Sequence, residues 1–146
     1  MAEAEDIVLR RFIAAPRERV FAAWLDPLSL VRWMRPGANA TATAEVDPRV
    51  GGQFRIVMTH SAGVAEHSGE YLLIEPPARL SFTWISAHTN QLATQVTVEC
   101  FDRDLGTEIV LTHRRLPEPR IDAHRQGWGT ILENLDQVLR ADRGAA

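Results

Sequence analysis

Residues 121–139 read IDAHRQGWGTILENLDQVL, and the apolar positions in this segment recur at intervals of three and four. This spacing places one apolar stripe along a helix of roughly twenty residues, or about 30 Å. Pro117 and Pro119 precede the segment, and Asp122 falls in its first turn, where a negative charge is favourable. The stripe comprises Ile121, His124, Trp128, Ile131, Leu132, Leu135, Val138 and Leu139. The sequence therefore predicts a long amphipathic C-terminal helix that needs an apolar surface to cover.

A sheet is the predicted partner of this helix, because the apolar period changes to two from residue 38 onward. Alternation of apolar and polar residues predicts six strands over residues 40–46, 53–59, 67–75, 80–85, 95–99 and 108–113. The connections between them are short, including a tight turn at residues 102–106. Short connections indicate an antiparallel meander.

The N-terminal part adds one strand and two short helices. Residues 5–13 read as a strand, and Pro16 suits the first turn of a following helix. Asp26-Pro27 is expected to end that helix, and a second short helical turn follows up to Trp33. We predict an α+β fold: a curved antiparallel sheet of about seven strands around the long C-terminal helix, with two short helices after strand 1. It forms a single domain over residues 1–146, with its core at about 7–140.

Composition limits the function classes. All 16 basic residues are Arg and none is Lys, which excludes Schiff-base and lysine general-base chemistry. The net charge of −3 argues against nucleic acid as a partner. The single cysteine, Cys100, excludes an internal disulfide. No apolar run reaches about 18 residues and the N-terminus does not resemble a signal peptide, so we expect a cytoplasmic protein without a membrane partner.

Several short segments, in this order and spacing, identify a likeness to a known family. They are RFIAAP (11–16), VFAAW (20–24), RW (32–33), GGQFR (51–55), GEYLLIEPP (69–77), RLSFTW (79–84) and GW (127–128) with Leu132 and Leu135. The chain resembles the C-terminal domain of the activator of the heat-shock protein 90 ATPase and the small bacterial proteins related to it. These belong to the START-like (SRPBCC) helix-grip superfamily.

The resemblance implies a helix-grip fold and a hydrophobic small molecule bound between sheet and helix. It also implies that catalysis can arise in the same place, because some superfamily members cyclise aromatic polyketides. The co-chaperone members carry a further N-terminal domain and a linker. A chain of 146 residues leaves no room for them, which argues against chaperone activation.

Inward-facing positions of the predicted elements give a candidate binding site for an apolar or aromatic small molecule. The candidate ligand-binding residues are Trp33, Met58, Tyr71, Phe82, Trp84, Leu111, His113 and Trp128. The indole N–H groups of Trp84 and Trp128 could point into the cavity. Gly127 and Gly129 flank Trp128, which indicates either close approach of helix and sheet or room for a ligand.

Three residues are candidate acids or bases: His113, His124 and Glu70. His113 is in phase with inward apolar residues, and His124 precedes Trp128 by one helical turn. Each histidine can instead be structural and hydrogen-bonded. Glu70 and Tyr71 cannot both face inward, because neighbours in a strand point to opposite faces. Only an inward Glu70 would have a raised pKa and be a catalytic candidate.

Other ligands and partners are less well supported. The five histidines and one cysteine lack the spacing of a metal site, so we expect no metal and no cofactor. A homodimer through the outer face of the sheet is possible, because Val57, Ile85 and Val110 interrupt its polar pattern. The leading hypothesis is a non-enzymatic binding protein. The alternatives are an enzyme of the cyclase, aromatase or hydrolase kind and a chaperone or protein-interaction module.

Overall fold

The computed structural model describes residues 6–35, 37 and 39–144 and contains a seven-stranded antiparallel sheet. Its strand order, β1-β7-β6-β5-β4-β3-β2, is a meander closed by the N-terminal strand at one edge, which confirms the predicted fold class. Residue 5 of the predicted first strand lies outside the described residues. The strands are β1 (Ile7–Ile13), β2 (Thr41–Val46), β3 (Gln53–His60), β4 (Gly63–Glu75), β5 (Arg79–Trp84), β6 (Thr94–Arg103) and β7 (Gly106–Arg114).

Two short helices follow β1, as predicted, and one long helix ends the described chain. The helical elements are α1 (Arg17–Ala23), α2 (Pro27–Trp33), η1 (Ala87–Thr89), η2 (Glu118–Arg120) and α3 (Ile121–Gly144). Asp26 does not end α1, which stops at Ala23. Its carboxylate accepts a 3.0 Å hydrogen bond from the Leu28 N–H and so caps the start of α2.

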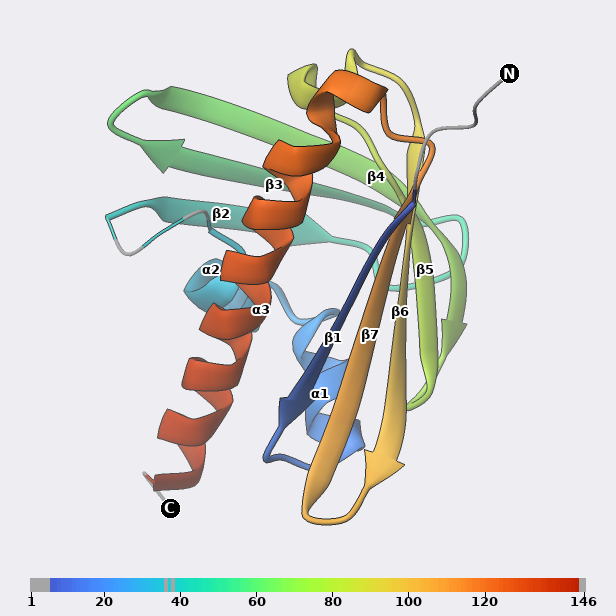
Figure 1. The fold of residues 1–146 in the computed structure, drawn as a ribbon, viewed down its shortest axis with the longest axis vertical. Helices are drawn as coiled ribbons and strands as arrows, with labels where there is room; N and C mark the ends of the chain where they lie inside the picture. Colours follow the sequence, from blue (N-terminus) through green and yellow to red (C-terminus); the bar gives the residue numbers. More distant parts are fainter. Residues whose placement is uncertain (1–5, 36, 38, 145–146) are drawn as a thin grey trace.

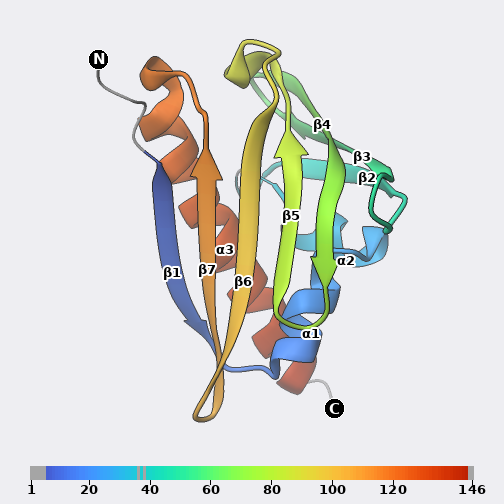
Figure 2. The same cartoon turned by 90° about the vertical axis from the view of Figure 1, so that its right-hand side faces the viewer.

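Helix α3 lies along the concave side of the sheet, and α1 and α2 lie near the C-terminal half of α3 (Figures 1 and 2). The buried stripe of α3 packs on the inward residues of the strands in one apolar core. Because β2, β3 and the first part of β4 turn away from the rest of the sheet, the β3–β4 hairpin lies opposite the N-terminal half of α3 (Figure 1).

A bulge in β4 decides which residues of this strand face inward. His67, Gly69 and Tyr71 are buried, whereas Glu70 is exposed. The register with β5 shifts between Tyr71 and Leu73. A bulge changes the phase of a strand by one residue, so Ile74, beyond it, pairs with the buried Leu80. Of Glu70 and Tyr71, Tyr71 is therefore the residue that faces inward.

Gly69 allows β4 to pass closely under its neighbours. A Cβ at this position would overlap the carbonyl oxygen of Thr83 and the ring of Phe54. Phe54 pairs with Gly69 across the β3–β4 ladder and covers it. Glycine is therefore required here because of space rather than backbone conformation.

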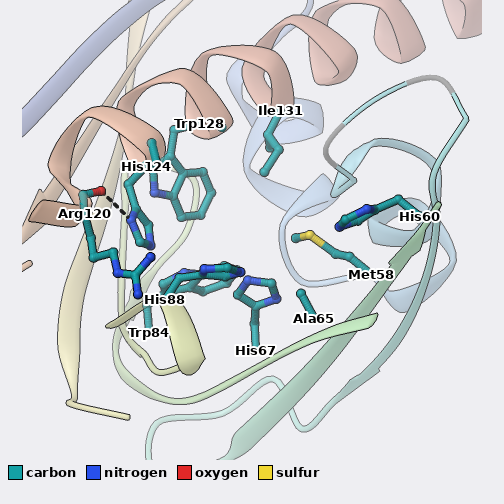
Figure 3. Close-up of a pocket in the computed structure, with 12 residues that line it drawn as sticks. Met58, His60, Ala65, His67, Trp84, His88, Arg120, His124, Trp128 and Ile131 are labelled. Carbon is teal, nitrogen blue, oxygen red and sulfur yellow. Dashed lines mark hydrogen bonds between the residues drawn. The ribbon is translucent and has the colours of Figure 1, made fainter. Parts of the chain in front are cut away.

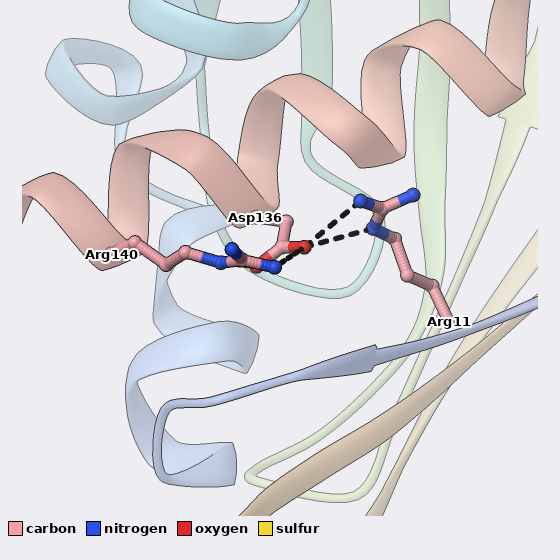
Figure 4. Close-up of polar contacts among 3 residues, drawn as sticks. All are labelled: Arg11, Asp136 and Arg140. Atoms are coloured by element: carbon pink, nitrogen blue, oxygen red, sulfur yellow. Dashed lines mark hydrogen bonds and ion pairs between the residues drawn. The ribbon is translucent and has the colours of Figure 1, made fainter.

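A buried carboxylate attaches α3 to the edge strand β1 (Figure 4). Asp136 is only 2% exposed and accepts hydrogen bonds from Arg11 at 2.9 and 3.1 Å and from Arg140 at 2.9 Å. Burial by itself raises the pKa of Asp136, but the hydrogen bonds from the two guanidinium groups outweigh it and the pKa is lowered. The carboxylate is therefore held in its charged form.

The surface offers two further findings. No helix within residues 6–35 and 39–144 is long and apolar enough to cross a membrane. Of the residues considered for a dimer face, Val57 and Ile85 are half-buried and Val110 is buried. Val8 and Phe12 of β1 are more exposed, at 50% and 48%. Dimerisation stays a prediction.

Candidate functional site

A pocket of about 200 Å³ lies between the first half of α3 and the β3–β4 hairpin. Its wall combines the ends of several elements, so no single segment of the sequence contains it. The lining residues are Met58, His60, Ala65, His67, Trp84, His88, Arg120, Ala123, His124, Gly127, Trp128 and Ile131. Figure 3 shows most of these side chains pointing toward one another around the space.

Two tryptophans form the aromatic part of the wall. The ring centroids of Trp84 and Trp128 are 5.0 Å apart with the planes inclined at 51°. The ring of His67 also stacks on Trp84, with the two ring centroids 4.7 Å apart. Trp84 is positioned by β5 and Trp128 by α3, so sheet and helix each contribute one indole. Flat apolar surfaces of this kind suit an aromatic or apolar ligand.

The orientation of Trp128 is fixed by a chain of hydrogen bonds behind the pocket. Its indole Nε1–H donates to Nδ1 of His113 at 2.9 Å. Indole nitrogen can only donate, so Nδ1 of His113 has no proton and the neutral ring carries it on Nε2. That Nε2–H donates to Oγ1 of Thr94 at 2.7 Å, and the Thr94 hydroxyl donates to the Trp84 carbonyl at 2.6 Å. The chain thus joins both tryptophans.

His113 is consequently a structural residue rather than a wall of the pocket. It is completely buried, and burial lowers its pKa to about 3, with a smaller contribution from the nearby His124. Both ring nitrogens are already hydrogen-bonded. The expectation that the Trp128 N–H points into the cavity is therefore wrong, because His113 accepts it.

His124 and His67 are the two partly or fully buried histidines that line the pocket. Nδ1 of His124 donates to the carbonyl oxygen of Arg120 at 2.9 Å, which leaves Nε2 as the free nitrogen. His67 is 6% exposed, and its Nδ1 is buried without a hydrogen-bond partner. Burial lowers the pKa of His67 to about 4 and also lowers the pKa of His124. Both rings are therefore neutral at neutral pH.

The predicted ligand-binding residues separate into two groups. Met58, Trp84 and Trp128 line the pocket. Tyr71 and Phe82, together with Trp84, surround a void of only about 10 Å³, which is too small for a ligand. Trp33, Leu111 and His113 are completely buried, and Trp33 donates its indole N–H to Ser29 at 3.1 Å. These last five residues therefore belong to the core.

The predicted acids and bases also separate. Among His113, His124 and Glu70, His124 is the one that lines the pocket. Glu70 is exposed on the outer face of β4, so the condition for its catalytic role is not met. Gly127 lies in the pocket wall, and a Cβ there would meet nothing within 4 Å. Of the two explanations for this glycine, room beside the helix is the one observed.

Sequence reasoning missed much of the polar wall. His60, His67, His88 and Arg120 come from β3, β4, η1 and η2, and with His124 they bring four of the chain's five histidines to one pocket. No group of three or more His, Cys, Asp or Glu in the described part of the chain is arranged to hold a metal ion. Of these residues, only His67 has a signal in the sequence, because it alternates with Gly69 and Tyr71 on the inward face of β4. The register shift later in β4 makes that inward face hard to assign from sequence.

A curved antiparallel sheet that wraps around one long C-terminal helix, with a pocket between them, defines the helix-grip class of proteins. The family model described as "Activator of Hsp90 ATPase homolog 1-like protein" matches residues 14–140. The chain therefore belongs to this family. No protein with a curated annotation matches the sequence.

Several solved structures have the same fold across nearly their whole length. Protein CV1439 from Chromobacterium violaceum is 27% identical, with a TM-score of 0.80 over 92% of this chain and 96% of its own. An AHSA1-like protein from Aeromonas hydrophila is 26% identical, with a TM-score of 0.78 over 94% of each chain. The AHSA1 protein SPO3351 from Silicibacter pomeroyi is 25% identical, with a TM-score of 0.80 over 94% of this chain and 99% of its own.

Proposed function

We propose that the protein binds a small, mainly apolar molecule in the pocket between α3 and the β3–β4 hairpin. The observation that carries the proposal is the space of about 200 Å³ beside Trp84, Trp128 and Ile131. Apolar side chains that face a space instead of one another leave surface that a ligand can cover. The void on the core side of this wall, beside Tyr71 and Phe82, measures only about 10 Å³.

The size of the space limits the ligand. Small-molecule pockets usually measure about 300–1,000 Å³, and a cavity of about 150 Å³ holds benzene. A volume of about 200 Å³ with an open side therefore suits a molecule of one or two rings. The inclined pair of Trp84 and Trp128 favours a flat molecule, because offset and edge contacts between rings are both available.

Two glycines of α3 provide a matched test. Gly127 lines the pocket and Gly129 does not, yet a Cβ at either position would meet nothing within 4 Å. We expect Gly127→Leu to fill the pocket and to weaken binding of a neutral two-ring probe, 2-naphthamide, at least tenfold in calorimetry. Gly129→Leu gives the same change of helix propensity and should leave the affinity unchanged.

Native mass spectrometry of freshly purified protein supplies a second test. A co-purified small molecule should be retained by the wild type and by Gly129→Leu and lost from Gly127→Leu. If the wild type binds no two-ring probe at 1 mM and carries no co-purified molecule, the proposed function is wrong. Equal binding by all three proteins places the ligand elsewhere and also contradicts it.

A further inference from the structure

The ionisable side chains that line the pocket are all basic. Its lining contains Arg120 and four histidines but no aspartate or glutamate. This is unexpected for a chain with 19 acidic residues and a net charge of −3. Acidic side chains that could neutralise a bound cation or compete for Arg120 are therefore absent from the wall.

Arg120 is the permanently charged group of this wall, because a guanidinium does not lose its proton in proteins. It is exposed and forms no ion pair with an acidic residue in the described part of the chain. Other arginines do, including Arg32 with Asp142 at 2.9 Å and Arg55 with Glu66 at 2.6 Å. The Arg120 guanidinium thus keeps its hydrogen-bond donors available at the mouth of the pocket.

Arg120 and two of the four histidines lie at one end of the pocket. Figure 3 shows Arg120, His88 and His124 there, with Met58 and His60 at the other end. Burial lowers the pKa of His124 most, and the charge of the Arg120 guanidinium makes a smaller contribution in the same direction, so the guanidinium acts on the His124 ring. The apolar surface of Trp84 and Trp128 lies beside it.

We infer that the ligand is a small aromatic acid, whose rings cover Trp84 and Trp128 and whose carboxylate pairs with the Arg120 guanidinium. This inference rests on the proposed function and adds the chemical class of the ligand. Guanidinium and carboxylate form two parallel N–H···O bonds, so the pair also orients the rings. No covalent step is involved.

Two probes of equal shape test the charge. Calorimetry should give a dissociation constant for 2-naphthoate about tenfold lower than for neutral 2-naphthamide, since a well-placed ion pair contributes on that order. In Arg120→Gln the two dissociation constants should become equal, through weaker binding of the naphthoate alone. Unchanged affinity for the amide shows that this variant is folded with its pocket intact.

Arg125→Gln is the matched control, because Arg125 carries the same charge on α3, faces Asp122 at 3.7 Å and does not line the pocket. It should keep the preference for naphthoate. Equal affinity of the wild type for both probes, a preference that survives in Arg120→Gln, or an equal loss in Arg125→Gln would each overturn the inference while the proposed function stands. Failure of both probes to bind at 1 mM overturns both.

Discussion

Trp128 and His113 are joined by a 2.9 Å hydrogen bond in which the indole donates to Nδ1, so one indole that forms the pocket wall is held from behind by a buried histidine. The bond connects a residue of α3 to a residue of β7 and continues through Thr94 to the backbone of Trp84. The aromatic wall of the pocket is therefore oriented by buried polar contacts as well as by packing.

Replacement of His113 should destabilise the protein strongly. His113→Phe retains the bulk of the ring but leaves the Trp128 N–H and the Thr94 hydroxyl with fewer partners, and an unsatisfied buried group costs about 1–3 kcal/mol. We expect the free energy of unfolding in urea to fall by about 3 kcal/mol. His60→Phe, at an exposed position, is the control and should change it by less than about 0.5 kcal/mol. Wild-type stability in His113→Phe would show that the chain of hydrogen bonds contributes little.

The stability of the wild type should decrease on acidification from about pH 6.5. The pKa of His113 is lowered to about 3 and that of His67 to about 4 in the folded protein. Below pH 6.5 the unfolded chain therefore binds more protons than the folded protein. Each of these histidines lowers the free energy of unfolding by about 1.4 kcal/mol per pH unit until the pH reaches its folded pKa.

Urea unfolding at pH 7.0, 6.0 and 5.0 measures this slope. His113→Phe lacks one of these titrating groups and should show a smaller slope than the wild type between these pH values, because His67 and His124 still titrate in the variant. If wild-type stability is independent of pH over this range, the two buried rings are not neutral in the folded state as described.

The Asp136 carboxylate should contribute about 2 kcal/mol to stability, because it accepts charge-assisted hydrogen bonds from Arg11 and Arg140. Asp136→Asn keeps the shape and removes the charge. Asp122→Asn, on the same helix and 94% exposed, is the control and should lower the free energy of unfolding by less than about 1 kcal/mol. Equal stability of the two variants in urea would contradict the role of this carboxylate.

The same carboxylate predicts a second acid-sensitive contribution. The folded pKa of Asp136 is lowered, so its stabilisation is complete above the unfolded pKa of about 3.9 and is lost as the pH falls through the folded value. The difference in stability between wild type and Asp136→Asn should therefore be constant above pH 5 and shrink below pH 4. A difference that persists unchanged at pH 2 would assign it to packing.

Gly69→Ala should be strongly destabilising, by more than about 2 kcal/mol, because the added methyl group overlaps the Thr83 backbone and the Phe54 ring. Gly129→Ala is the opposite case. Its methyl group meets nothing within 4 Å, and alanine in a helix is favoured over glycine by about 1 kcal/mol. The midpoint temperature of thermal unfolding should therefore fall in Gly69→Ala and rise in Gly129→Ala. Tolerance of Gly69→Ala would show that β4 can move away from Phe54.

The architecture was predictable because each element has its own period. The three-and-four spacing of α3 and the alternation of the strands are local signals, and together they fix which faces must be buried. The orientation of β4 was not predictable, since its two parts follow opposite phases. Tyr71 is inward before the bulge and Ile74 pairs inward after it, so either single phase misplaces some residues.

The pocket itself was only partly predictable. Trp84 and Trp128 carry strong signals, being large and in phase with their strand or helix. His60, His88 and Arg120 lie at the ends of β3, η1 and η2, where no period applies. They meet because the sheet bends and brings the β3–β4 hairpin opposite α3 (Figure 1). That bend depends on the whole sheet.

The bulge in β4 has a consequence for how the protein can change over evolutionary time. In an ordinary strand, a register slip of one residue exchanges the two faces along its full length. In β4 that exchange is already present near Leu72, so the part that carries His67 and the part that carries Ile74 keep independent alignments. Variation in the β3–β4 hairpin can therefore change the wall of the pocket while the alignment of β4 with β5 is inherited unchanged.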